Sequence, residues 1–224
     1  LPTIQGMRRR GYTPEAIFAF LSEIGVPKSE STVDIEMLEY FVRQDLNPKA
    51  ITLMSVLDPI KVVITNKDDE VEYLEADNSY SVDAMGTRKM PFTREIYIER
   101  EDFNENPPKK YNRLVPGGEV RLKHAYFLKC NDVIKDEQGN IVELHCTYDP
   151  STKSGSGFAG RKVKGTIHWV SATEGLPCLV RVYDSLFKSK PDEENLLESI
   201  NPESRQELTK AVIEPAILDF MDQN

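Results

Sequence analysis

The sequence is poor in cysteine and contains no long apolar run. Its three cysteines are far apart and odd in number, which favours reduced thiols over a disulfide framework. No apolar stretch approaches the roughly 20 residues that cross a bilayer. The first residues, LPTIQGMRRRGYT, include no apolar segment behind the arginines, so we expect neither a signal peptide nor a membrane partner. We therefore expect a cytoplasmic protein.

The chain also lacks an excess of basic residues. Its 28 lysines and arginines and its 37 acidic residues give a net charge of −9 at pH 7. This total argues against a uniformly basic binder of nucleic acid, and we expect no DNA partner. The charges are segregated, however, because residues 106–129 hold six cations and one acid, whereas residues 151–165 hold four cations and no acid. These two basic strips remain candidates for contact with a phosphate backbone.

Residues 1–49 have the pattern of a small helical subdomain. Thr13 followed by Pro14 is an N-cap with proline at the first helical position, and apolar residues then recur at helical spacing until Gly25. A capping pattern that ends at Asp34 predicts the start of a second amphipathic helix. The two helices are expected to pack through their apolar faces.

From residue 50 on, the apolar period changes from 3.6 to 2. Short alternating runs such as REIYIER, separated by turns rich in Gly, Pro and Asp, predict antiparallel barrels or sandwiches. The segment DVIKDEQGNIVELHCTYD predicts a hairpin with its turn at residues 138–140. A further helix is expected over residues 203–222. The sequence thus predicts an α+β protein that is mainly β.

Nothing in the sequence points to catalysis or to a metal. The run GSGFAG at residues 155–160 matches the glycine pattern of a dinucleotide loop, but it opens no helix, and we expect a flexible loop there. The histidines and cysteines lack the spacing of zinc ligands, and the strand neighbours His145 and Cys146 point to opposite faces. No G-x-S-x-G elbow is present. We therefore expect no catalytic residue and no metal site in this chain.

The stretch RKVKGTIHWV, residues 161–170, contains the only tryptophan. In a strand, Trp169 shares one face with Ile167, whereas His168 shares the other face with Val170. The two rings therefore cannot act together on one ligand. We predict that Trp169 belongs to a barrel core and that His168 is a structural or surface residue.

Basic residues gather at three places that suit nucleic acid. In the run EVRLKH, Arg121 and Lys123 are two residues apart and project from the same strand face. Guanidinium groups bind base edges through two hydrogen bonds, and an aromatic ring such as Tyr111 stacks on an unpaired base. The spacing alone fits a solvated strand face better than a binding site. The remaining candidates are the group around Tyr111, namely Lys110, Asn112 and Arg113, and a set of phosphate contacts, namely Arg161, Lys162 and Lys164.

Several of these stretches occur together in one known family. LPTIQGMRRRGYTPEAI, DPIKVVI, RLVPGGEVRLKHAY, GRKVKGTIHWVSA and INPES appear in the same order and at similar spacing in the glutaminyl-tRNA synthetases. The chain resembles that family from residue 1 to about residue 204. The segment MRRRGYTPEAI favours the glutaminyl enzymes over the related glutamyl enzymes, which share the architecture.

The resemblance implies the C-terminal, anticodon-binding region of such an enzyme. The family's class I catalytic domain has HIGH-like and KMSKS-like signatures, and neither occurs in this chain, which begins with Leu1 rather than Met. The implied fold is a helical subdomain followed by two antiparallel β-barrels like those of ribosomal proteins. The implied ranges are 1–49 for the helical subdomain, 50–100 with 181–224 for a proximal barrel whose last strands are missing, and 101–180 for a distal barrel.

The resemblance also implies partners and cofactors. The intact enzyme attaches glutamine to tRNA(Gln) with ATP and Mg²⁺, which bind in the catalytic domain. We therefore expect this chain to hold no cofactor, to be inactive alone, and to have tRNA(Gln) and its own N-terminal catalytic domain as partners. A monomer is expected.

Residue roles carry over only where the motifs match. Arg121 and Lys123 match the strand that contacts the first anticodon base, although the family commonly has arginine at both positions, so Lys123 should loosen discrimination. The segment that grips the third base supplies Lys110, Asn112 and Arg113. Thr52 falls where the family has an arginine for the middle base. The region that touches the inside of the tRNA elbow corresponds to Pro27, Lys28, Ser29, Glu30, Ser31, Thr32, Val33 and Asp34.

Two alternatives stay open from the sequence. The first is the same region of a glutamyl-tRNA synthetase or of a non-discriminating enzyme. The second is a β-barrel RNA-binding module that stands alone without any enzyme. The amino acid that is charged would separate the first from the leading interpretation, and the gene sequence upstream of Leu1 would separate the second.

Overall fold

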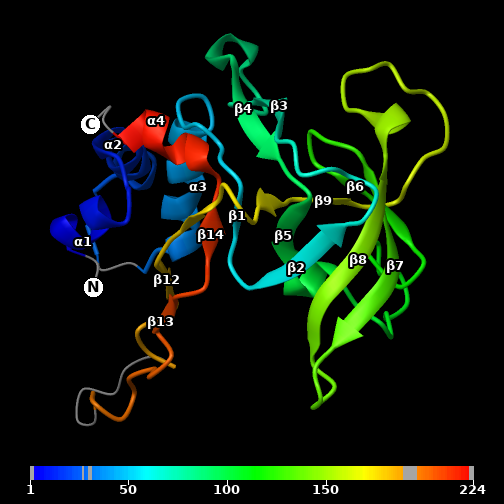
Figure 1. Cartoon of the computed structure of the whole chain (residues 1–224). Helices are drawn as coiled ribbons and strands as arrows, with labels where there is room; N and C mark the ends of the chain where they lie inside the picture. Colours follow the sequence, from blue (N-terminus) through cyan, green and yellow to red (C-terminus); the bar gives the residue numbers. More distant parts are fainter. Residues whose placement is uncertain (1–2, 27, 30–31, 189–195, 222–224) are drawn as a thin grey trace. The chain divides into compact units, whose positions relative to one another are not determined.

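The computed structural model describes residues 3–26, 28–29, 32–188 and 196–221. The chain divides into two compact units, which are described separately (Figure 1). The first comprises Leu1–Thr52 and Asp77–Gly86, and the second comprises Leu53–Ala76 and Thr87–Asn224. In the part of the chain that the structure describes, no helix has the length and apolar character needed to cross a membrane.

The first unit is built on three helices, α1 (Ile4–Arg9), α2 (Pro14–Ile24) and α3 (Ile35–Leu46), with a 3-10 turn at Asp83–Met85. The expected start and stop signals of α2 are confirmed. The Thr13 hydroxyl oxygen accepts a hydrogen bond from the backbone N–H of Ala16, and Gly25 ends the helix with a φ of 66°. The same Thr13 hydroxyl donates to a carboxylate oxygen of Asp45 on α3 at 2.7 Å, which ties α2 to α3. The helix α1 was not predicted from the sequence.

The second unit is mainly β, as predicted. Its largest sheet has seven strands in the order β10-β5-β2-β8-β7-β6-β9. A three-stranded sheet has the order β1-β14-β11, and two ribbons pair β3 with β4 and β12 with β13. Among the pairs in the large sheet, β2–β8 and β6–β9 are parallel and the others are antiparallel.

The strand bounds are β1 Ser55–Val56, β2 Pro59–Ile64, β3 Glu72–Asp77, β4 Thr87–Phe92, β5 Glu95–Glu99, β6 Glu119–Leu122, β7 Phe127–Lys135, β8 Ile141–Asp149, β9 Thr166–Ile167, β10 Val170–Ser171, β11 Leu176–Pro177, β12 Val180–Tyr183, β13 Arg205–Leu208 and β14 Val212–Ile213. Single 3-10 turns lie at Arg100–Asp102, Pro150–Thr152 and Pro215–Ile217, and a short helix, α4, spans Leu218–Met221. The predicted hairpin is the β7–β8 ribbon (Figure 1), with Gly139 in its turn at a φ of 85°.

The large sheet is curled, and one short segment of chain joins its two edge strands. The edge strands β9 and β10 are consecutive in sequence and are separated only by His168 and Trp169. Trp169 is fully buried, packs edge-on against Phe92 at 5.4 Å between ring centroids, and donates its indole N–H to the carbonyl oxygen of Lys123 at 2.9 Å. The prediction that Trp169 is a core residue is therefore confirmed.

The predicted neighbourhood of His168 is wrong in one respect. A continuous strand would place His168 and Val170 on the same face, but Val170 is buried, whereas the His168 side chain is about one third exposed. The strand is interrupted between β9 and β10, so the alternation of faces is lost there. His168 lies 3.6 Å from a carboxylate oxygen of Glu99.

The helix predicted over residues 203–222 is wrong over residues 205–213, and only its end, from Pro215 to Met221, is helical. Residues Arg205–Leu208 form β13 against β12, and Val212–Ile213 form β14 between β1 and β11. Helix resumes only after Pro215, whose missing N–H would break a continuous helix in the middle. Tertiary strand pairing overrides the local helical pattern here.

A buried ion pair connects β4 to the chain after β14. The Nε and Nη2 atoms of Arg88 donate to the two carboxylate oxygens of Glu214 at 2.9 and 2.6 Å. The backbone N–H of Met54 donates to the same carboxylate at 2.5 Å. Both charged side chains are at least nine-tenths buried, so either charge would be costly without the other.

We predict that Glu214→Gln destabilises the protein by roughly 3 kcal/mol, because the buried Arg88 charge loses its counter-ion. Chemical denaturation of the wild-type and variant proteins measures this change. Glu207→Gln is the matched control, because Glu207 pairs with Arg181 and Arg205 at an exposed position and its loss should leave the denaturation midpoint unchanged. Equal losses for the two variants would contradict this account of Glu214.

Candidate nucleic-acid interface

The strand β6 carries the first pair of predicted site residues. Val120 and Leu122 are buried in the core, whereas Arg121 and Lys123 are partly exposed, so the predicted alternation is confirmed. Lys123 lies just beyond the last residue of β6, and its backbone N–H donates to the carbonyl oxygen of Ile167 at 2.9 Å. Partial burial lowers the pKa of Lys123 from its ordinary value.

The segment 110–113 is held beside the 3-10 turn at Arg100–Asp102. The Nε of Arg113 lies 2.6 Å from a carboxylate oxygen of Asp102, whose side chain is only 8% exposed, whereas that of Arg113 is 49% exposed. Burial raises the pKa of the Asp102 carboxyl, and the charges of Arg113 and His168 oppose that shift. Among the described residues, Asp102 is the single ion-pair partner of the Arg113 guanidinium, and about half of the Arg113 side chain stays exposed to solvent.

The other members of this segment are Lys110, Tyr111 and Asn112. Lys110 has a φ of 70°, a left-handed conformation that is uncommon for a residue other than glycine. The Tyr111 hydroxyl donates to the carbonyl oxygen of Glu101 at 2.8 Å, and burial raises the pKa of Tyr111. Asn112 is exposed.

Gly165 connects this segment to β6. A Cβ atom at position 165 would lie 1.9 Å from the carbonyl oxygen of Asn112, so a larger residue would displace the segment. The carbonyl oxygen of Gly165 accepts a hydrogen bond from the backbone N–H of Arg121 at 2.9 Å. The structure therefore brings the two predicted base-contacting groups together on either side of Gly165.

The Arg121 side chain lies over an aromatic ring and against a loop. Its guanidinium carbon is 4.3 Å from the ring centroid of Phe127, and its Nη1 donates to the carbonyl oxygen of Thr152 at 3.1 Å and to the Ser154 hydroxyl oxygen at 3.0 Å. Burial lowers the pKa of Arg121, which remains cationic because its ordinary value is far above neutral. Sequence reasoning missed Phe127, Thr152 and Ser154, since a strand residue and a Ser/Gly-rich loop carry no signal for this contact.

Arg161 has partners that the sequence did not reveal. Its Nε and Nη2 donate to the two carboxylate oxygens of Glu119 at 2.9 and 2.7 Å, and Nη2 also donates to Asp149 at 2.8 Å. Both carboxylates raise the pKa of Arg161. Its role as a phosphate contact stays a prediction and now competes with this ion-pair cluster. Lys162 and Lys164 are exposed, and neither forms an ion pair with any described residue.

The remaining candidates belong to the first unit. The backbone N–H of Thr52 donates to the carbonyl oxygen of Asn78 at 2.8 Å. Asp34 directly precedes α3, as expected, but its side chain makes no capping hydrogen bond. The described members of the predicted elbow segment are all exposed: Lys28, Ser29, Thr32, Val33 and Asp34. Pro27, Glu30 and Ser31 lie outside the described residues.

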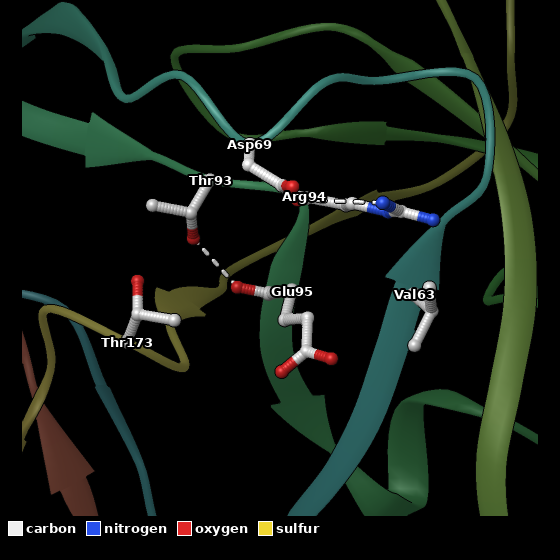
Figure 2. A pocket seen from close by; sticks show the side chains of 6 residues that line it. All are labelled: Val63, Asp69, Thr93, Arg94, Glu95 and Thr173. Carbon is white, nitrogen blue, oxygen red and sulfur yellow. Dashed lines mark hydrogen bonds and ion pairs between the residues drawn. The ribbon is translucent and has the colours of Figure 1, made fainter.

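A shallow pocket of about 500 Å³ lies elsewhere in the second unit and contains none of the predicted residues. The Nη1 of Arg94 lies 3.3 Å from a carboxylate oxygen of Asp69, and the Thr93 hydroxyl donates to the carbonyl oxygen of Glu95 at 2.6 Å (Figure 2). Glu95 also pairs with Lys61 at 2.8 Å, so the charges in this pocket are compensated locally. No cluster of metal-ligating side chains is found within the described residues.

Comparison with known proteins identifies the type of domain. Residues 52–149 match one model, and residues 166–223 a second model, of the anticodon-binding domain of the class I tRNA synthetases for E and Q. A glutamine–tRNA ligase of Clostridium perfringens is 54% identical over 228 residues, covering 100% of this chain and 41% of that protein. The corresponding protein of Clostridioides difficile is 55% identical over 219 residues, covering 96% of the chain and 39% of that protein.

A more distant relative, the glutamine–tRNA ligase of Bradyrhizobium diazoefficiens, is 49% identical over 221 residues, covering 98% of this chain and 40% of that protein. The chain therefore spans about two-fifths of the length of the curated relatives that it matches. Both models describe the same domain type, and together they cover most of the chain, including β6 and the segment 110–113. The chain belongs to the anticodon-binding domains of the class I tRNA synthetases of the glutamyl and glutaminyl type.

Proposed function

We propose that this chain recognises the anticodon of tRNA(Gln) as the C-terminal part of a glutamine–tRNA ligase. The relatives named above are glutamine–tRNA ligases that match the chain along almost its whole length, which supports glutamine over glutamate. In the whole protein, an N-terminal catalytic domain would bind ATP, Mg²⁺ and glutamine. The whole protein would act in the cytoplasm as a monomer, and its anticodon-binding part would complete two β-barrels.

The observation that carries the proposal is the state of the Arg113 side chain. The Nε of Arg113 lies 2.6 Å from the buried carboxylate of Asp102, while 49% of the Arg113 side chain is exposed. Such an arrangement fixes the side chain in advance and presents two parallel N–H donors, the geometry that binds base edges and phosphates. Anticodon bases are single-stranded and can be splayed out, so their edges are accessible to these donors.

The other roles follow the family pattern. Arg121 and Lys123 would contact the first anticodon base, and Arg113, with Lys110 and Asn112, the third. Thr52 would lie near the middle base, and the segment 27–34 would contact the tRNA elbow. Lys162 and Lys164 would contact phosphates, because they are exposed and have no acidic partner among the described residues. Arg161 joins them as a weaker candidate because two carboxylates already bind it.

Arg113→Ala in the full-length protein should lower kcat/KM for tRNA by about tenfold to a hundredfold, because one two-pronged base contact is lost. Charging assays with tRNAs changed at each anticodon base should show discrimination lost mainly at the third base. Arg181→Ala is the control, since Arg181 pairs with Glu207 away from β6. Unchanged discrimination at the third base in Arg113→Ala would refute this role.

The double variant Lys162→Ala/Lys164→Ala should weaken tRNA binding without changing base preference. Each lost phosphate contact lowers the slope of log affinity against log salt by about 0.7, so the two together should lower it by about 1.4. Lys135→Ala serves as the control because Lys135 pairs with Glu105 at 2.9 Å. A slope equal to that of the wild type would argue against phosphate contacts at Lys162 and Lys164. A reduced slope in Arg161→Ala would show that Arg161 also contacts a phosphate.

The choice of amino acid tests the proposed enzyme directly. The full-length protein should charge tRNA(Gln) with glutamine and should give no comparable product with glutamate. Parallel aminoacylation assays with the two labelled amino acids measure this. Efficient transfer of glutamate would instead place the chain in a glutamyl or non-discriminating synthetase, while leaving its anticodon-binding role in place.

A further inference from the structure

The guanidinium of Arg121 is fixed on two sides within the second unit. The ring of Phe127 lies against its flat face, and two oxygen acceptors from one loop, the Thr152 carbonyl and the Ser154 hydroxyl, bind its Nη1 at 3.1 and 3.0 Å. A third acceptor, the carbonyl oxygen of Ala125, lies at the limit of hydrogen bonding at 3.5 Å. An arginine side chain loses much of its rotational freedom on binding, and these contacts restrict that freedom in advance.

The loop that supplies these acceptors is itself anchored. The Thr152 hydroxyl donates to the carbonyl oxygen of Asp149 at 2.7 Å and accepts the backbone N–H of Phe127 at 2.8 Å. The backbone N–H and the hydroxyl of Ser154 both donate to the carbonyl oxygen of Ala125, at 2.8 and 2.9 Å. Residues 152–154, which lead into the loop at 155–160 that was predicted to be flexible, are therefore anchored by hydrogen bonds.

Arg161 closes the other end of the same loop. It binds Glu119 on β6 through two hydrogen bonds and Asp149 at the end of β8 through a third. Its guanidinium carbon also lies 5.2 Å from the ring centroid of Phe127. The loop is thus attached at both ends to the strands around Arg121.

These contacts decide which edge of each arginine remains open. In Arg121 the Nη1 atom is occupied, whereas Nε and Nη2 have no partner among the described residues, so its open edge is Nε–Nη2. In Arg113 the Nε atom lies 2.6 Å from a carboxylate oxygen of Asp102, and no hydrogen bond from Nη1 or Nη2 to another described residue is formed. Each edge carries two parallel donors, but the two face their ligands with different sides of the guanidinium.

We propose that Ser154 is a positioning residue that sets the direction in which Arg121 presents its Nε–Nη2 edge to the first anticodon base. The inference rests on the proposed function. The Ser154 hydroxyl donates to the carbonyl oxygen of Ala125 and accepts a hydrogen bond from Nη1 of Arg121. It therefore fixes the guanidinium relative to the backbone. Without it, Nη1 keeps the Thr152 carbonyl and the Phe127 ring, but the guanidinium can rotate about that remaining contact. Base preference at the first position therefore depends on a loop that does not itself touch the base.

The experiment compares Ser154→Ala, Ser154→Thr and Ser156→Ala in the full-length protein. Ser156 is the matched control, because it lies in the same loop and its hydroxyl donates only to the carbonyl oxygen of Lys153. For each protein, kcat/KM is measured with tRNAs that carry each of the four bases at the first anticodon position and, separately, at the third.

Ser154→Ala should reduce the ratio between the best and worst first-position base by about tenfold, the effect of one hydrogen bond to a charged group. The ratio at the third position should be unchanged, because Arg113 is held by Asp102. Ser154→Thr, which keeps the hydroxyl, should restore the first-position ratio, and Ser156→Ala should match the wild type. If Ser154 had only a structural role, Ser154→Ala would lower kcat/KM for all tRNAs by the same factor, or it would change the base-preference ratios at the first and third positions together.

Arg121→Ala separates failure of the inference from failure of the proposed function. If Arg121→Ala loses first-position discrimination while Ser154→Ala keeps it, Ser154 does not position Arg121, but the anticodon role stands. If Arg121→Ala itself leaves first-position discrimination intact, the proposed role of Arg121 is wrong, and the inference falls with it. An equal effect of Ser154→Ala and Ser156→Ala would also overturn the inference, because it would reflect general loosening of the loop.

Discussion

The interface depends on the curling of the large sheet around Trp169. The strands β9 and β10 form opposite edges of a seven-stranded sheet, yet only two residues separate them, so the sheet must curl to bring its edges together. The buried indole of Trp169 fills the interior at this point and donates to the carbonyl oxygen of Lys123. In the same segment, the Gly165 carbonyl accepts from the backbone N–H of Arg121. The stretch that links the two edges of the sheet therefore also fixes the strand that presents Arg121 and Lys123.

Three arginines show how partners decide the role of one residue type. Arg161 is bound along its Nε–Nη2 edge by two carboxylates and serves to attach a loop. Arg113 is held from behind by the buried Asp102, and Arg121 is held at Nη1 by loop oxygens. The last two keep an edge with two donors, which is the arrangement that reading a base requires. Local charge density in the sequence cannot distinguish these cases.

Much of the fold followed from local patterns, and the exceptions have physical causes. The period of two placed Arg121 and Lys123 on one strand face, and Thr13, Pro14 and Gly25 marked the ends of α2. The helix predicted over 203–222 failed because β13 and β14 pair with strands that are distant in sequence, and because Pro215 interrupts a continuous helix. The partners of Arg161 were missed because Glu119 lies 42 residues away in the sequence. The roles of Phe127 and Ser154 depend on the folded position of a loop, which composition alone does not define.

The central claim is that Arg113 and Arg121 contact the anticodon bases, whereas Arg161 mainly binds Glu119 and Asp149. The most direct test is an NMR titration of the arginine-labelled full-length protein with an anticodon stem-loop. The titration follows the chemical shifts of the arginine Nε–Hε resonances. The account predicts large shifts for Arg113 and Arg121 and a much smaller shift for Arg161. A large shift of Arg161, with the signals of Arg113 and Arg121 unmoved, would contradict it.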